Sequence, residues 1–315
     1  MLQLDFINVG YGDSILVQSF SQERTFRMLV DCGDGRPVVN LPGQRKISTL
    51  EFLQKRDIRE LDLLILTHMH KDHIGGFAAV ADTVAICEVW TGYLPEESLF
   101  RIYLSEAGKL PKENERILKP MYRVFQTLNQ LREKGVPVRL MRGENRFSFS
   151  DLGFELIVTS AGETLFQTQN QAFEAISNGI GSDSLPFNIH SVMNDSSLRI
   201  RLCYGMQSVE LPGDFCAAAW LESAIRPCTL LKLPHHGHAD SMTEALFSQL
   251  SPAVTVISVS DDRVDDCPAK AVVDLIRRNG SELLFTGHAP EDFSETDGHE
   301  SVRVMLNQDS IYWEV

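Results

Sequence analysis

The stretch LTHMHKDHIGG, residues 66–76, follows the apolar run Leu63–Leu66 and collects four metal-ligand side chains within six positions. The apolar run predicts a buried strand over 61–66, so the cluster stands where that strand ends. Imidazole nitrogens and carboxylate oxygens are donors that zinc and similar first-row ions take. At this composition the pattern HxHxDH appears by chance in roughly one chain of this length in two thousand, which favours a metal half-site over a histidine-rich loop. The four side chains are His68, His70, Asp72 and His73.

The spacing of these four residues indicates that their side chains point in two different directions. On an extended segment alternate residues project to the same side. We therefore expect His68, His70 and Asp72 to converge, while the adjacent histidine points elsewhere. A division of this kind suits two neighbouring ions, and a half-site of this kind needs partners from other strand ends.

Two later strand ends carry further candidate donors. ELPGD, residues 210–214, ends in Asp214, which either bridges two cations or occupies a Pro-Gly turn. LLKLPHHGH, residues 230–238, ends another apolar run with three histidines. Six of the nine histidines fall in the two clusters, and a purely structural role explains this poorly. The histidines of the second cluster are His235, His236 and His238.

Composition and charge exclude some classes of function. Of the 315 residues, 43% are apolar and 23% are charged, as is usual in globular proteins. The net charge of −14 and the lack of a Lys/Arg-rich block disfavour binding to extended duplex nucleic acid. Bound divalent cations would offset the negative charge locally, so a phosphate-containing or ester substrate stays compatible with the sequence.

The sequence also predicts a compartment. No apolar run is long enough to cross a bilayer, and the amino-terminal residues lack the basic and apolar regions of a signal peptide. The six cysteines include no CxxC pair, which suits reduced thiols better than a disulfide framework. We therefore expect a cytoplasmic protein that does not contact a membrane.

The order of the predicted elements indicates a layered α/β fold. Short strands open the chain, and helices alternate with strands over its last hundred residues. A charged segment with a helical period predicts a helical insertion at about 95–135. The Gln-, Asn- and Ser-rich segment of about 160–190 predicts a long polar loop. No linker interrupts the sequence, so we expect a single domain over 1–315.

Together these segments resemble the metallo-β-lactamase fold hydrolases. The chain is more closely similar to the soluble hydrolase domain of the ComEC DNA-uptake proteins and their free-standing relatives. The resemblance spans almost the whole chain and is weakest in 95–135 and 160–190. It implies an αββα four-layer sandwich with the metal site along one edge of the two sheets. The matching segments are FINVGYGDSILVQ (6–18), LVDCG (29–33), LTHMHKDHIGG (66–76), NDSSLRIRL (194–202), LPGD (211–214) and LKLPHHGHADS (231–241).

The resemblance implies that the donors hold two divalent metal ions, with Zn²⁺ expected and Mn²⁺ as the alternative. His68 and His70 fall to the first ion, and Asp214 bridges the two ions. The donors of the second ion are Asp72, His73 and one of His235 and His236, of which His236 is favoured.

The chain departs from the family pattern in three places. The early DVGQGD of the relatives reads NVGYGD here, residues 8–13. Many relatives supply a third histidine to the first ion before the bridging aspartate. No clear counterpart exists here, and His190, Asn194 or a water molecule are the open candidates. The residue after HHG, usually serine in the relatives, is His238.

The predicted site suggests a reaction. Two cations about 4 Å apart acidify a bridging water to hydroxide and clamp both oxygens of an in-line displacement. Asp72 is placed to orient that hydroxide, and His235 or His238 to protonate the leaving group or stabilise the transition state. We predict a dinuclear metal-dependent hydrolase of phosphodiesters, either small ones or single-stranded nucleic acid. The alternatives are a lactone, ester or thioester hydrolase with the same site, and a non-catalytic, metal-stabilised partner in a multi-protein system.

Three neighbouring side chains have two interpretations each. Asp13 and Asp31 either fix histidine tautomers beside the ions or serve as turn residues. Lys232 either meets a phosphate or is an ordinary strand-edge lysine, and the second interpretation is favoured.

Overall fold

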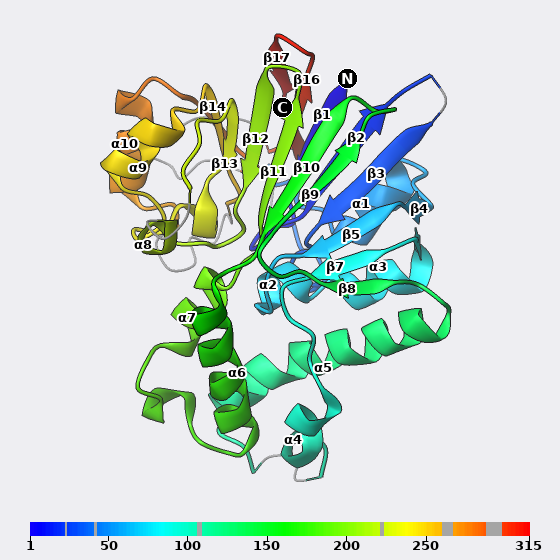
Figure 1. Ribbon diagram of the computed structural model, residues 1–315, viewed down its shortest axis with the longest axis vertical. Helices are drawn as coiled ribbons and strands as arrows, with labels where there is room; N and C mark the ends of the chain where they lie inside the picture. Colours follow the sequence, from blue (N-terminus) through cyan, green and yellow to red (C-terminus); the bar gives the residue numbers. More distant parts are fainter. Residues whose placement is uncertain (23, 41–42, 106–108, 221–223, 260–266, 288–297) are drawn as a thin grey trace.

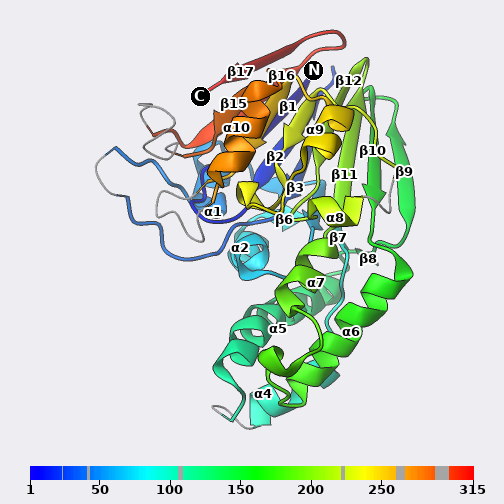
Figure 2. The same cartoon turned by 90° about the vertical axis from the view of Figure 1, so that its left-hand side faces the viewer.

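Two β-sheets packed face to face, with helices on both outer sides, form the body of the protein (Figures 1 and 2). This confirms the predicted αββα four-layer sandwich. The computed structural model describes residues 1–22, 24–40, 43–105, 109–220, 224–259, 267–287 and 298–315. Residues 106–108 of the expected helical insertion therefore lie outside the described part.

Within the described residues, the first sheet has the strand order β17-β16-β1-β2-β3-β5-β7-β8. The strands from β3 to β8 run parallel to one another, so the segments that follow them begin at the same edge of the sheet. The strands are β1 Leu2–Ile7, β2 Ile15–Phe20, β3 Thr25–Val30, β5 Leu63–Leu66, β7 Val89–Thr91, β8 Val138–Leu140, β16 Ser301–Leu306 and β17 Ile311–Glu314.

The second sheet has the order β15-β14-β13-β12-β11-β10-β9 within the same described ranges. The strands β12 to β15 are parallel, so the segments after β12 and β13 also leave from one edge. The strands are β9 Glu144–Phe149, β10 Phe154–Thr159, β11 Arg199–Tyr204, β12 Gln207–Leu211, β13 Leu230–Lys232, β14 Val254–Ile257 and β15 Glu282–Phe285. A separate short pair joins β4 Glu60–Leu61 to β6 Ala85–Ile86.

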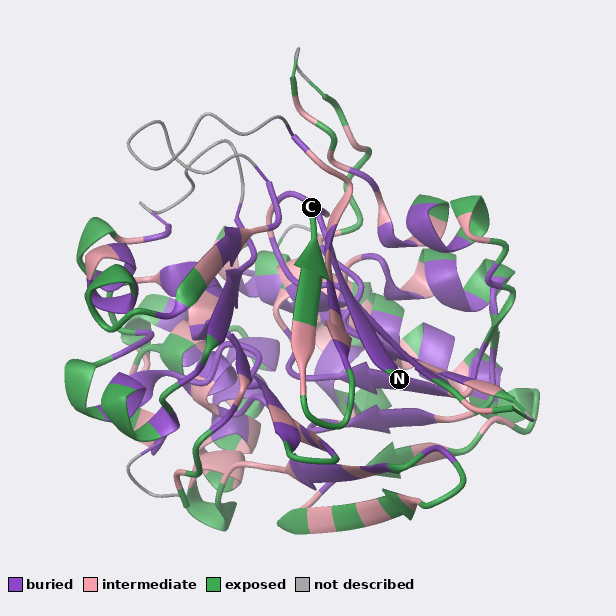
Figure 3. Cartoon of the chain, turned by 90° about the horizontal axis from the view of Figure 1, so that it is seen from above, coloured by how far each residue is buried: buried purple, intermediate pink, exposed green. Residues whose placement is uncertain are grey.

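Three apolar clusters hold the layers together. Side chains such as Leu4 and Leu156 fill the space between the sheets. The outer face of the first sheet packs against α1 Thr49–Lys55, α3 Phe77–Thr83 and α5 Lys112–Glu133. That of the second sheet packs against α8 Ala217–Trp220, α9 Glu244–Leu250 and α10 Lys270–Arg278. Strands covered on both faces read as continuous apolar runs, and Figure 3 shows many of them buried throughout.

A group of helices lies below the sheets in Figure 1. It contains η1 Glu97–Phe100, α4 Arg101–Ser105, α5, α6 Glu163–Ser177, η2 Ser182–Ser184 and α7 Ile189–Asp195. The expected polar loop of 160–190 is therefore wrong, because most of it is helical. Phe166, Gln169, Phe173 and Ile176 recur at helical spacing, and the last three are buried. The ring of Phe173 meets that of Tyr93 edge-on, with 4.8 Å between centroids.

Across the described ranges, no helix combines the length and the apolar character that a bilayer crossing needs.

Candidate metal centre

The segment after β5 positions four of the candidate donors. His68 and His70 lie on irregular chain, whereas Asp72 and His73 lie on the short helix α2, Lys71–Ile74. The expected extended segment is therefore wrong beyond His70. The chain turns there because the carbonyl of His70 accepts a hydrogen bond from the backbone N–H of His73 at 3.0 Å. As a result, Asp72 groups with His73 rather than with the two preceding histidines.

Asp31, which directly follows β3, anchors this segment. Its Oδ1 accepts the backbone N–H of Thr67 at 2.8 Å, and its Oδ2 accepts the Thr67 hydroxyl at 2.6 Å. The same Oδ2 lies 2.8 Å from Nδ1 of His73. Asp31 thus orients the imidazole and leaves Nε2 of His73 facing the centre, a tautomer-fixing position rather than that of a simple turn residue.

Close backbone approach explains the glycines of the two motifs. Gly12 has φ +109°, and a Cβ at this position would stand 1.9 Å from the carbonyl oxygen of Asp72. A Cβ on Gly76 would stand 2.1 Å from the carbonyl oxygen of Cys32. Only glycine fits at such distances. The glycines of FINVGYGDSILVQ and LTHMHKDHIGG therefore let backbone segments pack closely around the donors.

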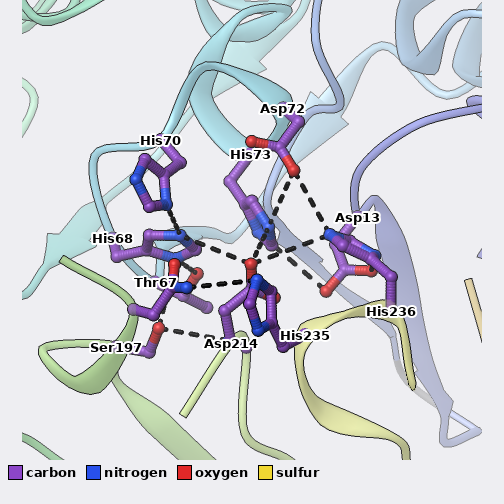
Figure 4. A network of polar contacts seen from close by, with 12 residues as sticks. Asp13, Thr67, His68, His70, Asp72, His73, Ser197, Asp214, His235 and His236 are labelled. Atoms are coloured by element: carbon purple, nitrogen blue, oxygen red, sulfur yellow. Dashed lines mark hydrogen bonds and ion pairs between the residues drawn. The ribbon is translucent and has the colours of Figure 1, made fainter. Parts of the chain in front are cut away.

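The first donor set combines His68 and His70 with Asp214, which follows β12 (Figure 4). Nε2 of His68 lies 3.0 Å from Nδ1 of His70. The same Nε2 lies 3.7 Å from Oδ2 of Asp214. Two imidazole nitrogens and a carboxylate oxygen therefore face one another in a buried position.

The second donor set combines Asp72, His73 and His236 with the same Asp214. Nε2 of His73 lies 3.2 Å from Oδ2 of Asp214 and 3.5 Å from Oδ2 of Asp72. Nε2 of His236 lies 3.2 Å from Oδ2 of Asp72 and 3.7 Å from Oδ2 of Asp214. Oδ2 of Asp214 thus belongs to both sets, as Figure 4 shows.

The two sets fit divalent cations. In each set one donor atom per residue lies within 4.8 Å of all the others, and the donors are nitrogen and oxygen. Oδ1 of Asp214 is buried without a hydrogen-bond partner among the described residues, and the ammonium of Lys232 stays 3.8 Å away from it. A buried carboxylate oxygen needs such a partner, and a cation contact would meet that need.

Burial and charge set the protonation of the donors. Burial holds the pKa of His68 well below its usual value and lowers the pKa of His70 to about 4, so both are neutral at neutral pH. Neutral imidazole is the form that binds a metal. Burial also acts to lower the pKa of His73, but the surrounding carboxylates, Asp214 first, outweigh it and raise that pKa. The negative charge of these carboxylates favours a positive charge among them, and a bound cation would supply it.

Neither protein candidate for the third ligand of the first ion joins the first donor set. Nδ1 of His190 lies 3.0 Å from Nε2 of His70, the nitrogen that does not contact His68. Nε2 of His190 lies 3.3 Å from Oε1 of Glu113 on α5. The amide nitrogen of Asn194 lies 3.1 Å from Nε2 of His235. His190 therefore stands between His70 and α5, outside the donor set.

The second histidine cluster divides its side chains. His235 and His236 have φ of 48° and 52°, and their ring centroids lie 6.4 Å apart. His236 enters the second donor set, whereas His235 and His238 line the cavity beside it. Nδ1 of His235 and Nδ1 of His238 each lie 3.1 Å from Oδ1 of Asp240. This position suits the proton-donor role expected for one of them, which stays a prediction.

Lys232 is neither a strand-edge lysine nor a phosphate contact. Its side chain is fully buried, and Nζ forms an ion pair with Asp13. Oδ1 of Asp13 lies 3.7 Å from Nδ1 of His236, so the pair stands directly behind the second donor set. Nothing in the sequence near either residue predicts this pairing.

A cavity of about 870 Å³ opens beside the donor sets, between α2, α5 and α7. Four basic side chains line it, together with Glu113, Asp240 and the two donor aspartates Asp72 and Asp214. The spacing of three of the basic residues, at i, i+3 and i+7 of α5, places them on one helix face. A chain of net charge −14 thus presents a basic wall beside the donor sets. The basic residues are Lys71, Arg116, Lys119 and Arg123.

Comparison with known proteins identifies the family. The model of the metallo-beta-lactamase superfamily matches residues 7–260. The chain belongs to the metallo-β-lactamase superfamily. Superfamily members are mostly hydrolases that bind divalent metals, and the two donor sets are candidate sites for such ions.

Individual relatives of this superfamily protein are distant. ComE operon protein 3 of Bacillus subtilis (strain 168) is 23% identical over 296 residues, which make up 90% of this chain and 32% of that protein. The chain thus spans about a third of that relative, and the predicted ComEC-like resemblance is confirmed.

Solved structures share the fold at low identity. The metallo-β-lactamase fold protein YhfI from Bacillus subtilis is 12% identical, with a TM-score of 0.44 over 90% of this chain and 96% of that chain. A diphosphatase of the PhnP family is 13% identical, with a TM-score of 0.45 over 98% of both chains. The short form of human tRNase Z is 10% identical, with a TM-score of 0.39 over 84% of this chain and 94% of that chain.

Proposed function

We propose that this superfamily member is a dinuclear metal-dependent phosphodiesterase. One observation carries the proposal, namely that two nitrogen–oxygen donor sets share Asp214 beside a cavity with a basic wall. Two-metal sites are suited to in-line phosphoryl displacement, because they stabilise both the attacking and the leaving oxygen. Two Zn²⁺ ions are the proposed occupants, with Mn²⁺ as the alternative, and both ions accept these donors.

The protein's own residues divide the work. His68 and His70 would hold the first ion, and Asp214 would contact both. The remaining donors, Asp72, His73 and His236, would hold the second ion. Bound ions supply Lewis acidity and lower the pKa of water. Oδ2 of Asp72 faces Nε2 of His73 and Nε2 of His236 within the second set, and it would accept a proton from the attacking water.

The cavity wall would bind the substrate. Arg116 and Arg123 can each take two phosphate oxygens with a planar guanidinium, while Lys119 adds a mobile positive charge. His235 would protonate the leaving oxygen through Nε2, because Asp240 holds its Nδ1 at 3.1 Å. His238 is the alternative donor, since its Nδ1 is held by the same carboxylate.

The size and charge of the site limit the substrate. A cavity of about 870 Å³ is within the range that encloses one small ligand. The net charge of −14 opposes long duplexes, whereas four basic side chains line the cavity beside the donor sets. We therefore propose a small phosphodiester or the end of a single strand. We place the protein in the cytoplasm, because all six cysteines are free thiols.

A substrate panel tests this proposal. The Zn²⁺- or Mn²⁺-loaded protein is assayed with bis-p-nitrophenyl phosphate, end-labelled single-stranded DNA and a simple lactone. We expect turnover of at least one phosphodiester, its loss in Asp72→Ala, and its retention in Asp309→Ala, which changes an exposed residue between β16 and β17. Turnover of the lactone alone would instead favour an ester hydrolase. No turnover of any substrate by protein with two bound ions would favour a non-catalytic partner.

A further inference from the structure

A third group of metal-ligand side chains lies at the rim of the cavity, outside the two donor sets. It contains Cys216, His235 and Asp240, whose donor atoms all lie within 4.8 Å of one another. Sγ of Cys216 lies 3.8 Å from Nδ1 of His235, which lies 3.1 Å from Oδ1 of Asp240. Nδ1 of His238 lies 3.1 Å from the same oxygen, and its ring stacks on that of His235 with 4.8 Å between centroids. Three donors of different chemistry therefore lie close together, and His238 contacts the carboxylate among them.

The spacing of these donors fits a tetrahedral ion. Zinc bonds of about 2.0–2.3 Å at tetrahedral angles separate neighbouring donors by about 3.3–3.6 Å. The separations of 3.1 Å and 3.8 Å lie on either side of this range. We propose that Cys216, His235 and Asp240 form a third metal site with an open fourth position, selective for an ion that binds thiolate, such as Zn²⁺ or Co²⁺.

The backbone around His235 is built to serve this site. A φ of 48° is uncommon for a residue with a side chain and persists where surrounding contacts enforce it. The N–H of His235 donates to the carbonyl of Gly213 at 3.3 Å, and its carbonyl accepts the N–H of His238 at 2.8 Å. This turn sends His236 into the second donor set and the preceding histidine into the third site.

Binding at the third site is a simple exchange of proton for metal. The ion forms a bond to Sγ of Cys216, and the thiol proton leaves to solvent without any change of oxidation state. Nδ1 of His235 donates its lone pair to the ion, which leaves the proton on Nε2. The side-chain amide of Asn194, whose nitrogen now lies 3.1 Å from Nε2 and whose oxygen has no hydrogen-bond partner among the described residues, would turn its oxygen to accept this N–H. The third site would therefore hold the His235 ring in place, and its existence does not depend on the reaction proposed above.

Sulfur distinguishes this site from the other two. The first and second donor sets contain only nitrogen and oxygen, whereas the third contains a cysteine. Thiolate ligands favour Zn²⁺ and Co²⁺ over Mn²⁺. A Co²⁺–thiolate bond also gives a near-ultraviolet charge-transfer absorption, which nitrogen and oxygen ligands do not produce. Cobalt absorption therefore reports on the third site alone.

The test is a Co²⁺ titration of the full, metal-free chain. We expect three Co²⁺ ions to bind per chain. The sulfur-to-cobalt absorption band should reach a final intensity that corresponds to one Co²⁺–thiolate bond per chain. In Cys216→Ser the band should disappear and the stoichiometry should fall to two. Cys228→Ser, which changes another buried cysteine, should keep both. With Mn²⁺ the unchanged protein should bind two ions.

A second variant guards against misfolding of Cys216→Ser. Asp240→Asn changes an exposed carboxylate and should weaken Co²⁺ binding at the thiolate site at least tenfold, while two other ions still bind. Absence of the band at saturating Co²⁺, or its persistence in Cys216→Ser, would overturn the proposal. If the unchanged protein hydrolyses a phosphodiester but shows no band, the third site is wrong and the proposed phosphodiesterase stands. The two proposals can therefore fail separately.

Discussion

The ammonium of Lys232 forms a buried ion pair with the carboxylate of Asp13 and thereby joins the two sheets. Lys232 ends β13 of the second sheet, and Asp13 lies just before β2 of the first. Asp13 also stands 3.9 Å from Nδ1 of His73 and 3.7 Å from Nδ1 of His236. The pair therefore supports both histidines of the second donor set from behind.

Lys232→Met should destabilise the protein by about 3–5 kcal/mol, because it leaves a buried carboxylate without its cation. Denaturant unfolding in the presence of a chelator measures this loss apart from metal binding. The exposed Lys55, paired with Glu51 and Glu300, provides the control, and Lys55→Met should cost under about 1 kcal/mol. A second change, Asp13→Asn, should restore part of the stability of Lys232→Met. Equal effects of the two lysine substitutions would contradict the buried pair.

Asp214→Asn should remove more metal than any single histidine substitution, because Asp214 belongs to both donor sets. With Mn²⁺ as the probe, we expect two ions per chain in the unchanged protein, about one in His70→Ala and fewer than one in Asp214→Asn. The loss of a metal ion removes several kcal/mol of transition-state stabilisation, so kcat should fall by about 10³-fold or more. Asp240→Asn should keep both Mn²⁺ ions. Two bound ions in Asp214→Asn would rule out bridging by this residue.

The basic face of α5 should act on substrate binding rather than on chemistry. Arg116→Ala combined with Arg123→Ala should raise KM about tenfold or more for a phosphodiester, since each charged contact is worth about 1.5–3 kcal/mol. The same variant should make KM less sensitive to salt. Arg132→Ala, near the other end of α5 and outside the cavity lining, is the matched control. An unchanged KM would show that Arg116 and Arg123 do not bind the substrate.

The fold is predictable from the sequence where the local pattern is strong. Apolar runs that end in histidine clusters mark strands whose carboxyl ends meet at one edge, and both sheets follow this rule. Helix α6 escapes prediction because its turns are rich in Gln and Thr, and only Phe166, Phe173 and Ile176 carry the helical spacing. Its stability comes from packing against neighbours such as Tyr93 rather than from its own composition.

The donor motifs can also be predicted from the sequence, but the residues that surround them in the fold cannot. The pairing of Lys232 with Asp13 joins segments far apart in the chain, and no local signal reports it. The helical period of α5 predicts a helix, whereas only tertiary docking decides that Arg116 and Arg123 face the cavity. The departure of Asp72 from an extended path depends on backbone hydrogen bonds of a short helical turn, in which the carbonyl of His70 accepts the N–H groups of His73 and Ile74.

Phe173→Ala should test whether α6 is a fixed part of the fold. The side chain is fully buried, so its truncation should cost about 3–5 kcal/mol of unfolding free energy. Gln171→Ala, on the exposed side of the same helix, should change stability by less than about 0.5 kcal/mol. Similar small effects for both variants would indicate that α6 packs only weakly.

Glu210 should make stability depend on pH. Burial raises its pKa in the folded protein, although Arg199 and Arg201 oppose the shift. A raised folded pKa means that the folded state binds more protons, so this contribution to stability is full at low pH and is lost as pH rises through that pKa. The unfolding free energy of the unchanged protein minus that of Glu210→Gln should therefore fall with rising pH. The opposite slope for Glu210→Gln would disprove the assignment.

The division of the donors between two sheets has a consequence for biosynthesis. Four donors lie between His68 and His73, whereas Asp214 follows His73 by 141 residues. At a translation rate of about 5–20 residues per second, the nascent chain carries these four donors without Asp214 for about 7–28 s. During that interval the first four donors can already capture an ion, before the bridging carboxylate exists. Metal availability at the ribosome would then influence which ion the finished protein holds, independently of the preference of its completed site.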